Sequence, residues 1–146
     1  MAKALERKTS VSAECLLAVA ESRLAEFELL RREKRFVTAV YISGYAVEAL
    51  LKCAICKTLR TQELPIVFHY HDLDSLLFFS GFEGDLKVVP RIYDNFTKFA
   101  TTWNPEWRYR HPVQENLAAE QICNDVAVWL NDSGEGVVPW LKGRLL

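Results

Sequence analysis

The chain has 146 residues, of which half are hydrophobic and a quarter are charged, and its formal net charge at pH 7 is −1. This balance supplies enough apolar material for one hydrophobic core, so we expect a single domain over residues 1–146. The total charge excludes the strongly basic proteins that nucleic acid attracts through net charge alone, and any such function must rest on local patches.

The N-terminus lacks the features of a secretory signal, because it has neither an apolar run of about ten residues nor a cleavage site. The most apolar stretch, AVYISGYAVEALL at 39–51, is too short to span a bilayer and contains Glu48. We therefore expect a soluble, cytoplasmic protein without a membrane partner.

The first helix is expected from Val11 to Arg32, because apolar residues recur there at spacings of three and four. Ser10 or Ser12 can cap it. The basic cluster RREKR at 31–35 closes the helix and spans the turn into the next one. With the basic opening MAKALERKTS, this cluster either faces phosphate or an acidic partner, or is a solvated helix end.

The second helix is expected from Arg35 to Leu59, and it has two distinct faces. One face is an apolar seam made of Val37, Val40, Gly44, Val47, Leu51 and Ile55. The other face carries, at helical spacing, Tyr41, Tyr45, Glu48 and Lys52. Glu48 and Lys52 can pair across one turn. The face is therefore a candidate polar groove, a structural ion-pair network or a surface for a second subunit.

Gly44 lies in the interior of this helix, where glycine costs about 1 kcal/mol relative to alanine. Its presence indicates the close approach of another backbone. Pro65 then interrupts the helical pattern, and a short helix follows from Asp72 to Ser80 with Asp72 as its cap. The sequence GFEG at 81–84 is expected to be a loop.

A third long helix is expected over Leu86–Thr102, and it begins nearer Val89 because proline is tolerated only in a first turn. Its inner face carries Ile92, Phe96 and Phe99. A turn between Pro105 and Pro112 leads to a fourth helix over Val113–Asn131. The inner face of that helix carries Ile122, Cys123, Val126, Trp129 and Leu130. The tail VVPWLKGRLL is amphipathic and docks either on the bundle or on a partner.

The cysteines and histidines do not form a recognisable metal pattern. We interpret all four cysteines as small apolar packing residues: Cys15, Cys53, Cys56 and Cys123. His69, His71 and Asp72 resemble a metal trio, but the local sequence supplies no further ligand. We therefore predict no metal site and no cofactor. His71 is expected to cap or pack at the start of the short helix.

No segment shows the two-residue period of a strand, so the expected fold class is all-α. The four long helices and their short connections predict an up-and-down four-helix bundle with short additional helices.

Three motifs in order resemble the HEPN domain family: GYAVEALLKCAI at 44–55, HDLDSLL at 71–77 and WNPEWRY at 103–109. The similarity extends over about residues 12–131. The resemblance implies a homodimer that binds RNA or a nucleotide. It also implies a cognate protein such as a nucleotidyltransferase or an antitoxin, in a phage-defence or toxin–antitoxin system.

Catalytic members of that family carry an arginine, four to six residues and then a histidine near the start of the last helix. Here Arg108 and Arg110 precede His111 by two intervening residues and by none, so the nuclease spacing is absent. The residue types nevertheless suit phosphate chemistry, because histidine titrates near neutrality and arginine binds phosphate through two parallel donors. Arg108 and His111 are thus the catalytic candidates.

The preferred hypothesis is a binding module without nuclease activity. Its candidate binding residues are Tyr41, Tyr45, Glu48, Lys52, Arg108, Tyr109 and Arg110. The first alternative is a metal-independent endoribonuclease that uses Arg108 and His111 across a homodimer. The second is a purely structural interaction module. In a structural interpretation of the turn itself, two tryptophans and Tyr109 bury it, and Arg108 pairs with a carboxylate such as Glu48.

Overall fold

The computed structural model describes residues 11–146, and its regular elements there are all helical, which confirms the all-α fold class. The basic opening MAKALERKTS, with Ser10, lies outside the described residues. The helices are α2 (Ala13–Arg32), α3 (Phe36–Leu59), α4 (Leu73–Ser80), α5 (Glu83–Lys87), α6 (Pro90–Thr102), α7 (Leu117–Asn131) and α8 (Val137–Leu145). Three short 3₁₀ turns join them: η1 (Ile66–Phe68), η2 (Pro105–Tyr109) and η3 (Pro112–Gln114).

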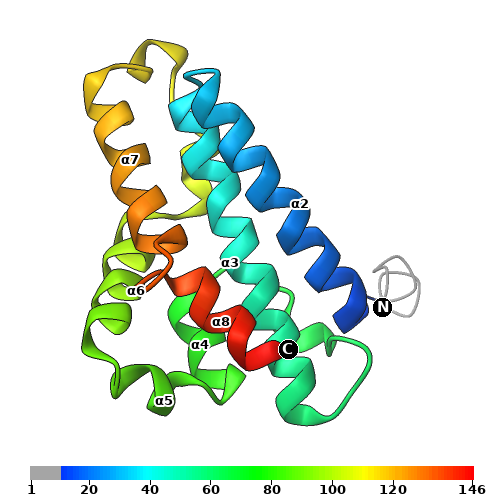
Figure 1. Cartoon of the computed structure of the whole chain (residues 1–146). Coiled ribbons are helices and arrows are strands. Elements are labelled where there is room, and N and C mark those ends of the chain that lie inside the picture. Colours follow the sequence, from blue (N-terminus) through cyan, green and yellow to red (C-terminus); the bar gives the residue numbers. More distant parts are fainter. Residues whose placement is uncertain (1–10) are drawn as a thin grey trace, which may run out of the picture.

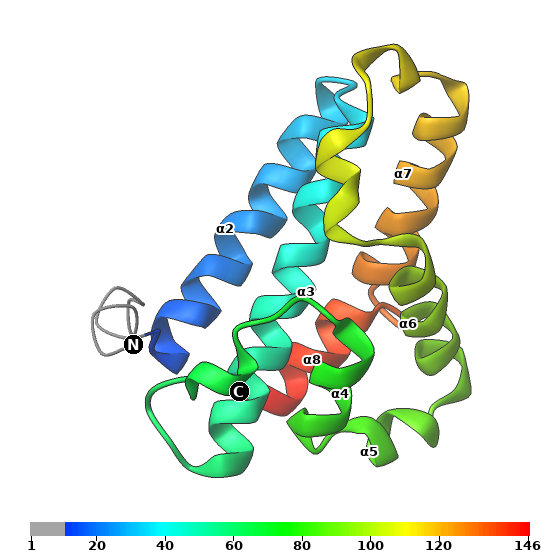
Figure 2. The same cartoon turned by 180° about the vertical axis from the view of Figure 1, so that it is seen from behind.

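Helix α3 lies at the centre of the molecule. It contacts α2, α4, α7, α8 and η2, and α2 runs beside it for most of its length (Figure 1). Seen from behind, α4 lies against the C-terminal half of α3 and η2 against the N-terminal half (Figure 2). Helix α6 packs on α5, α7 and α8. The structure is thus organised around one central helix, and the four-helix bundle stays a prediction.

The central position of α3 follows from its composition, because it is apolar around most of its circumference. By length and composition alone, its 24 residues would be enough to cross a membrane. The sequence stretch at 39–51 that was judged too short to span a bilayer is therefore only part of a longer apolar helix. In its most apolar window, however, 78% of the residues are buried inside the protein. Core helices of soluble proteins have the same properties. All six residues of the expected apolar seam are buried.

Helix α2 begins two residues later than expected and ends at Arg32, as predicted. Ser12 is its cap, since the Ser12 Oγ accepts a hydrogen bond from the Cys15 N–H at 3.0 Å. The turn into α3 contains a backbone with positive φ at Lys34. A carboxylate that is distant in the sequence completes the start of α3: the Val37 N–H donates to Glu115 Oε1 at 2.9 Å.

Two expected boundaries are wrong for local reasons. The GFEG segment is not entirely loop, because Glu83 already begins α5. The last long helix begins at Leu117 rather than Val113, because residues 112–114 form η3 first. The Asn116 side chain then accepts from the Ala119 N–H at 3.1 Å and caps α7. The expected start of α6 is confirmed, with Pro90 in its first turn.

The C-terminal tail folds onto the protein as α8, which confirms docking on the helical body. Its apolar face buries Val137, Val138 and Leu141 against α3, α6 and α7. Of the two docking sites expected for this segment, the helical body of the same chain is therefore the one observed.

The cysteines divide into three buried ones and an exposed one. Burial raises the pKa of the Cys123 thiol to about 11, and it also raises the pKa values of Cys53 and Cys56. These three pack as small apolar side chains, as expected. The prediction is wrong for Cys15, which is exposed because the neighbouring Leu16 occupies the core-facing position of α2.

Candidate functional site

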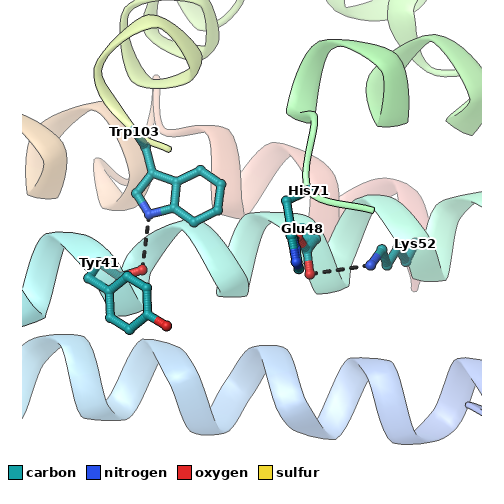
Figure 3. Close-up of polar contacts among 5 residues, drawn as sticks. All are labelled: Tyr41, Glu48, Lys52, His71 and Trp103. Carbon is teal, nitrogen blue, oxygen red and sulfur yellow. Dashed lines mark hydrogen bonds and ion pairs between the residues drawn. The ribbon is translucent and has the colours of Figure 1, made fainter. Parts of the chain in front are cut away.

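A buried carboxylate, Glu48, organises the polar face of α3. Lys52, one turn further along, donates from Nζ to Glu48 Oε2 at 3.3 Å, and both side chains are only 10% exposed. The other oxygen, Oε1, lies 2.6 Å from Nδ1 of His71, which comes from the segment before α4 (Figure 3). The pair expected between Glu48 and Lys52 is therefore present. The suggested pair between Glu48 and Arg108 is wrong, because Lys52 and His71 occupy the carboxylate.

The start of α4 holds His71 in this position. Asp72 caps the helix, with its carboxylate accepting from the backbone N–H groups of Asp74 and Ser75 at 3.1 and 3.3 Å. The cap fixes the chain direction one residue after His71. In a neutral imidazole, donation from Nδ1 to the carboxylate leaves Nε2 as an acceptor. The arrangement can therefore hold a base or a hydrogen-bonding group at an exposed edge, since half of the His71 side chain is exposed.

An aromatic cluster continues this polar face toward the N-terminus of α3. The ring of Tyr45 makes edge-to-face contacts with His71, Trp103 and Tyr41, with centroid distances of 5.7, 5.4 and 5.2 Å. Trp103 reaches α3 from the end of α6, and its indole Nε1 donates to the Tyr41 carbonyl at 3.0 Å (Figure 3). The cluster thus connects the Glu48 network with the segment after α6.

Gly44 makes the contact with Trp103 possible. A Cβ atom at this position would lie 1.7 Å from Cε2 of the Trp103 indole. The sequence correctly indicated a close approach, but the approaching group is a side chain and not a backbone.

The pKa of the Tyr45 phenol is raised above its ordinary value. Burial raises its pKa to about 12, the hydrogen bond that the Tyr45 hydroxyl donates to Tyr41 and the nearby Glu48 carboxylate act in the same direction, and the Arg108 guanidinium opposes them. Tyr45 therefore stays neutral at physiological pH and acts as an aromatic and hydrogen-bonding surface.

This shift predicts a loss of stability at high pH. Between the ordinary pKa of 10.0 and about 12, the folded protein keeps the Tyr45 proton that the unfolded chain releases. The folded state then binds more protons, so the free energy of unfolding falls as pH rises through this interval. Tyrosinate absorbance should show a late ionisation that Tyr45→Phe removes and that Tyr109→Phe, on the exposed turn, leaves in place. An unchanged late step in Tyr45→Phe would assign it to another tyrosine.

A cavity of about 310 Å³ lies beside the Glu48 network, between α2, α3 and the segment at 64–71. Its polar lining consists of Arg23, Tyr45, Glu48, Lys52, His69 and His71. Its apolar lining consists of Val11, Leu16, Val19, Ala49 and Leu64. Sequence reasoning missed the roles of Arg23, His69 and His71 here. The available signal was the H-x-H element beside the helix motif that contains Glu48.

The arginines of the turn lie over aromatic rings. The Arg108 guanidinium lies 4.7 Å from the Tyr109 ring centroid, and that of Arg110 lies 3.5 Å from the Trp107 ring centroid. Trp107 is buried and donates from Nε1 to the Thr102 carbonyl at 2.9 Å. Tyr109 is 70% exposed, so the expectation that it buries the turn is wrong. Of the three aromatic residues expected to bury the turn, Trp103 and Trp107 are buried.

Arg108 also joins the turn to α3. Hydrogen bonds from its guanidinium to Tyr109 and, less strongly, to Tyr41 raise the pKa of Arg108. Tyr41, Tyr45, Glu48 and Lys52 share the face of α3 that the sequence predicted, and Arg108 stands at its N-terminal end. His111 is exposed beyond η2, where its backbone N–H donates to Gln114 Oε1 at 2.8 Å.

Within residues 11–146, no three or more histidine, cysteine, aspartate and glutamate side chains are grouped so that they could hold a metal ion. When the chain is compared with protein-family models, with curated proteins and with solved structures, none of them matches. The resemblance to the HEPN family therefore rests on the three sequence motifs, and the function has to be inferred from the site.

Proposed function

We propose that the chain is a HEPN-like domain that acts as a homodimeric binding module for single-stranded RNA or a nucleotide, without nuclease activity. The observation that carries this proposal is the exposed turn on which Arg108 lies over Tyr109 and Arg110 lies over Trp107. Arginine beside an exposed aromatic ring suits single-stranded nucleic acid, because the guanidinium binds phosphate while a base stacks on the ring. The ring available for stacking here is Tyr109, which is exposed, whereas Trp107 is buried.

The charges of this turn are available to a ligand. None of the ion pairs recorded in the described part of the chain involves Arg108 or Arg110. Glu106 is the carboxylate that acts on Arg108 from the same turn, and it is exposed. The contact of Arg108 with Tyr41 extends the surface onto α3. We call Tyr41, Arg108, Tyr109 and Arg110 the arginine–aromatic strip.

The remaining parts of the proposal come from the family resemblance. A homodimer would present the arginine–aromatic strip twice. The resemblance also suggests a cognate nucleotidyltransferase or antitoxin, a role in phage defence and a cytoplasmic location. The absent arginine-to-histidine spacing supports binding rather than cleavage.

We expect the double variant Arg108→Ala/Arg110→Ala to bind a labelled single-stranded RNA at least ten times more weakly than the wild type. Fluorescence anisotropy at several salt concentrations measures this, and the salt slope should fall by about 0.7 for each phosphate that the variant no longer neutralises. Arg91→Ala is the matched control, because the Arg91 side chain is 82% exposed on α6, away from the strip. Light scattering on the same samples gives the subunit number.

Each alternative has its own outcome in this experiment. Cleavage of the RNA that disappears in His111→Ala would favour the endoribonuclease and contradict the binding module. A dimer that neither retains nor cleaves RNA would favour the structural interaction module. Equal weakening in Arg91→Ala would mean that binding follows general charge and not the strip.

A further inference from the structure

We infer that an exposed aromatic surface on α4 and η1 is the interface through which two copies of the chain associate. This surface, the phenylalanine patch, consists of Ile66, Val67, Phe68, Phe78 and Phe79. The inference rests on the homodimer of the proposed function, to which it gives an interface, and it does not depend on RNA binding.

The patch is continuous from one segment to the other. The rings of Phe78 and Phe79 meet edge to face with their centroids 5.1 Å apart, and the Phe79 ring centroid lies 5.4 Å from that of Phe68. Ile66 and Val67 precede Phe68 in the same 3₁₀ turn. Contiguous exposed apolar surface of this kind marks sites of interaction on folded proteins.

Helix periodicity places two of these phenylalanines on the outer face of α4. The inner face of the helix is buried and consists of Leu73, Leu76, Leu77 and Ser80. Phe78 and Phe79 point away from that face, and they are 64% and 48% exposed. The core therefore uses neither ring completely, and both are available to a partner.

The size of the patch matches what a symmetric dimer requires. Ile66 and Val67 are 43% and 74% exposed. With about 200 Å² for a phenylalanine side chain and about 100 Å² for an aliphatic one, the four exposed side chains present roughly 350 Å² of apolar surface. Two copies that face each other across a two-fold axis would bury about 700 Å² of it. A stable interface of about 1,200 Å² is about 60% apolar, so it needs an apolar area of this size.

A second copy fits the patch because the patch is complementary to itself. Beside Phe78 lies a shallow depression of about 310 Å³, which is also lined by Gly81, Glu83, Gly84 and Lys87. It is open at Gly84, where an added Cβ would meet no atom within 4 Å. A phenylalanine ring of one copy can therefore enter the depression of the other. Glu83 and Lys87 have opposite charges, so a two-fold axis can bring each of them opposite its counterpart in the second copy.

The phenylalanine patch and the arginine–aromatic strip lie at different ends of α3. Helix α4 packs against the C-terminal half of α3, and η2 packs against the N-terminal half (Figure 2). A dimer formed through the patch would leave both strips outside the interface. Dimerisation and RNA binding can therefore be measured independently.

Phe78→Lys should raise the dissociation constant of the dimer at least tenfold in sedimentation equilibrium, because it places a charge in the apolar centre of the interface. In the separate subunit the introduced ammonium can pair with Asp74, one turn earlier in α4, so the helix should stay folded. Val128→Lys is the matched control and should dimerise as the wild type does. Val128 is 59% exposed on α7, outside the patch.

Gly84→Lys fills the depression without altering an aromatic side chain. The position has open space for a Cβ, and lysine favours a helix more than glycine does, so the subunit should stay folded. The dissociation constant of the dimer should again rise at least tenfold. Gly143→Lys is its control, because Gly143 is equally open but lies in α8. Circular dichroism establishes that each variant is folded.

Three results would overturn the inference. A wild type that stays monomeric at the highest concentration would remove the interface together with the homodimer. A dimer that neither Phe78→Lys nor Gly84→Lys weakens would remove the interface alone. A monomer that sediments with phosphatidylcholine vesicles, and no longer does so in Phe78→Lys, would assign the patch to a lipid surface.

Failure of the interface and failure of the RNA proposal are distinguishable. Both patch variants should still bind single-stranded RNA in the anisotropy experiment, because the strip is intact. The double variant Arg108→Ala/Arg110→Ala should dimerise as the wild type does.

Discussion

Replacement of Gly44 by alanine should lower the free energy of unfolding by about 3 kcal/mol, at the upper end of the usual cost of overpacking a core. Helix propensity predicts the opposite, a gain of about 1 kcal/mol. The steric term should dominate, because the new Cβ would lie 1.7 Å from the Trp103 indole. Trp103 cannot yield easily, since it is buried and its Nε1 donates to the Tyr41 carbonyl.

Urea denaturation of a matched pair separates the two effects. Gly143→Ala is the control, because Gly143 is also in a helix and nothing lies within 4 Å of the Cβ it would gain. That variant should be neutral or up to about 1 kcal/mol more stable. Trp103→Leu should cost less in the Gly44→Ala background than in the wild type, because the clash is relieved. A stabilised Gly44→Ala would show that the indole does not lie against α3 as described.

The second large effect is expected at the buried carboxylate. Glu48→Gln should lower the free energy of unfolding by about 3 kcal/mol, because removing one partner of a buried pair leaves the other charge uncompensated. The charge left behind is Lys52, which is buried in α3. His71 would also lose its anionic acceptor. Near-UV circular dichroism should report loosening of the surrounding aromatic cluster.

Asp94→Asn is the matched control for this substitution. Asp94 and Lys98 form a pair at the same four-residue spacing on α6, but their side chains are 59% and 52% exposed. Exposed pairs contribute about 0–1 kcal/mol, so this variant should be close to the wild type. The double variant Glu48→Gln/Lys52→Met removes both charges and should recover most of the loss. Similar costs for Glu48→Gln and Asp94→Asn would contradict a buried network.

Much of the helical organisation can be predicted from the sequence, because helix periodicity and caps are local. The bounds of α2 and α3 agree with the apolar spacing within two residues, and Ser12 and Asp72 cap the helices they precede. The start of α7 was missed because two competing local signals occur there. Pro112 can start a helix, but Asn116 supplies the side-chain cap, and the cap decides the boundary.

Solvent exposure in the turn after α6 was harder to predict. Three aromatic residues of the turn looked equally suited to burial, yet Trp103 and Trp107 are buried and Tyr109 is not. Trp103 follows directly on α6 and its indole N–H finds a carbonyl acceptor in α3, while Trp107 lies in η2 and its indole N–H finds one at the end of α6. No local pattern in the sequence contains that information.

By itself, the sequence determined the two faces of α3 and the pairing of Glu48 with Lys52. Both depend on residues four apart in one helix, where backbone geometry sets the distance. Only the tertiary structure decided that His71 shares this carboxylate and that Trp103 lies over Gly44. These partners are 23 and 59 residues apart in the chain, so the path of the intervening helices sets their distances. The cavity beside Lys52 and His69 has the same origin, because its walls come from separate segments that meet only when the chain has folded.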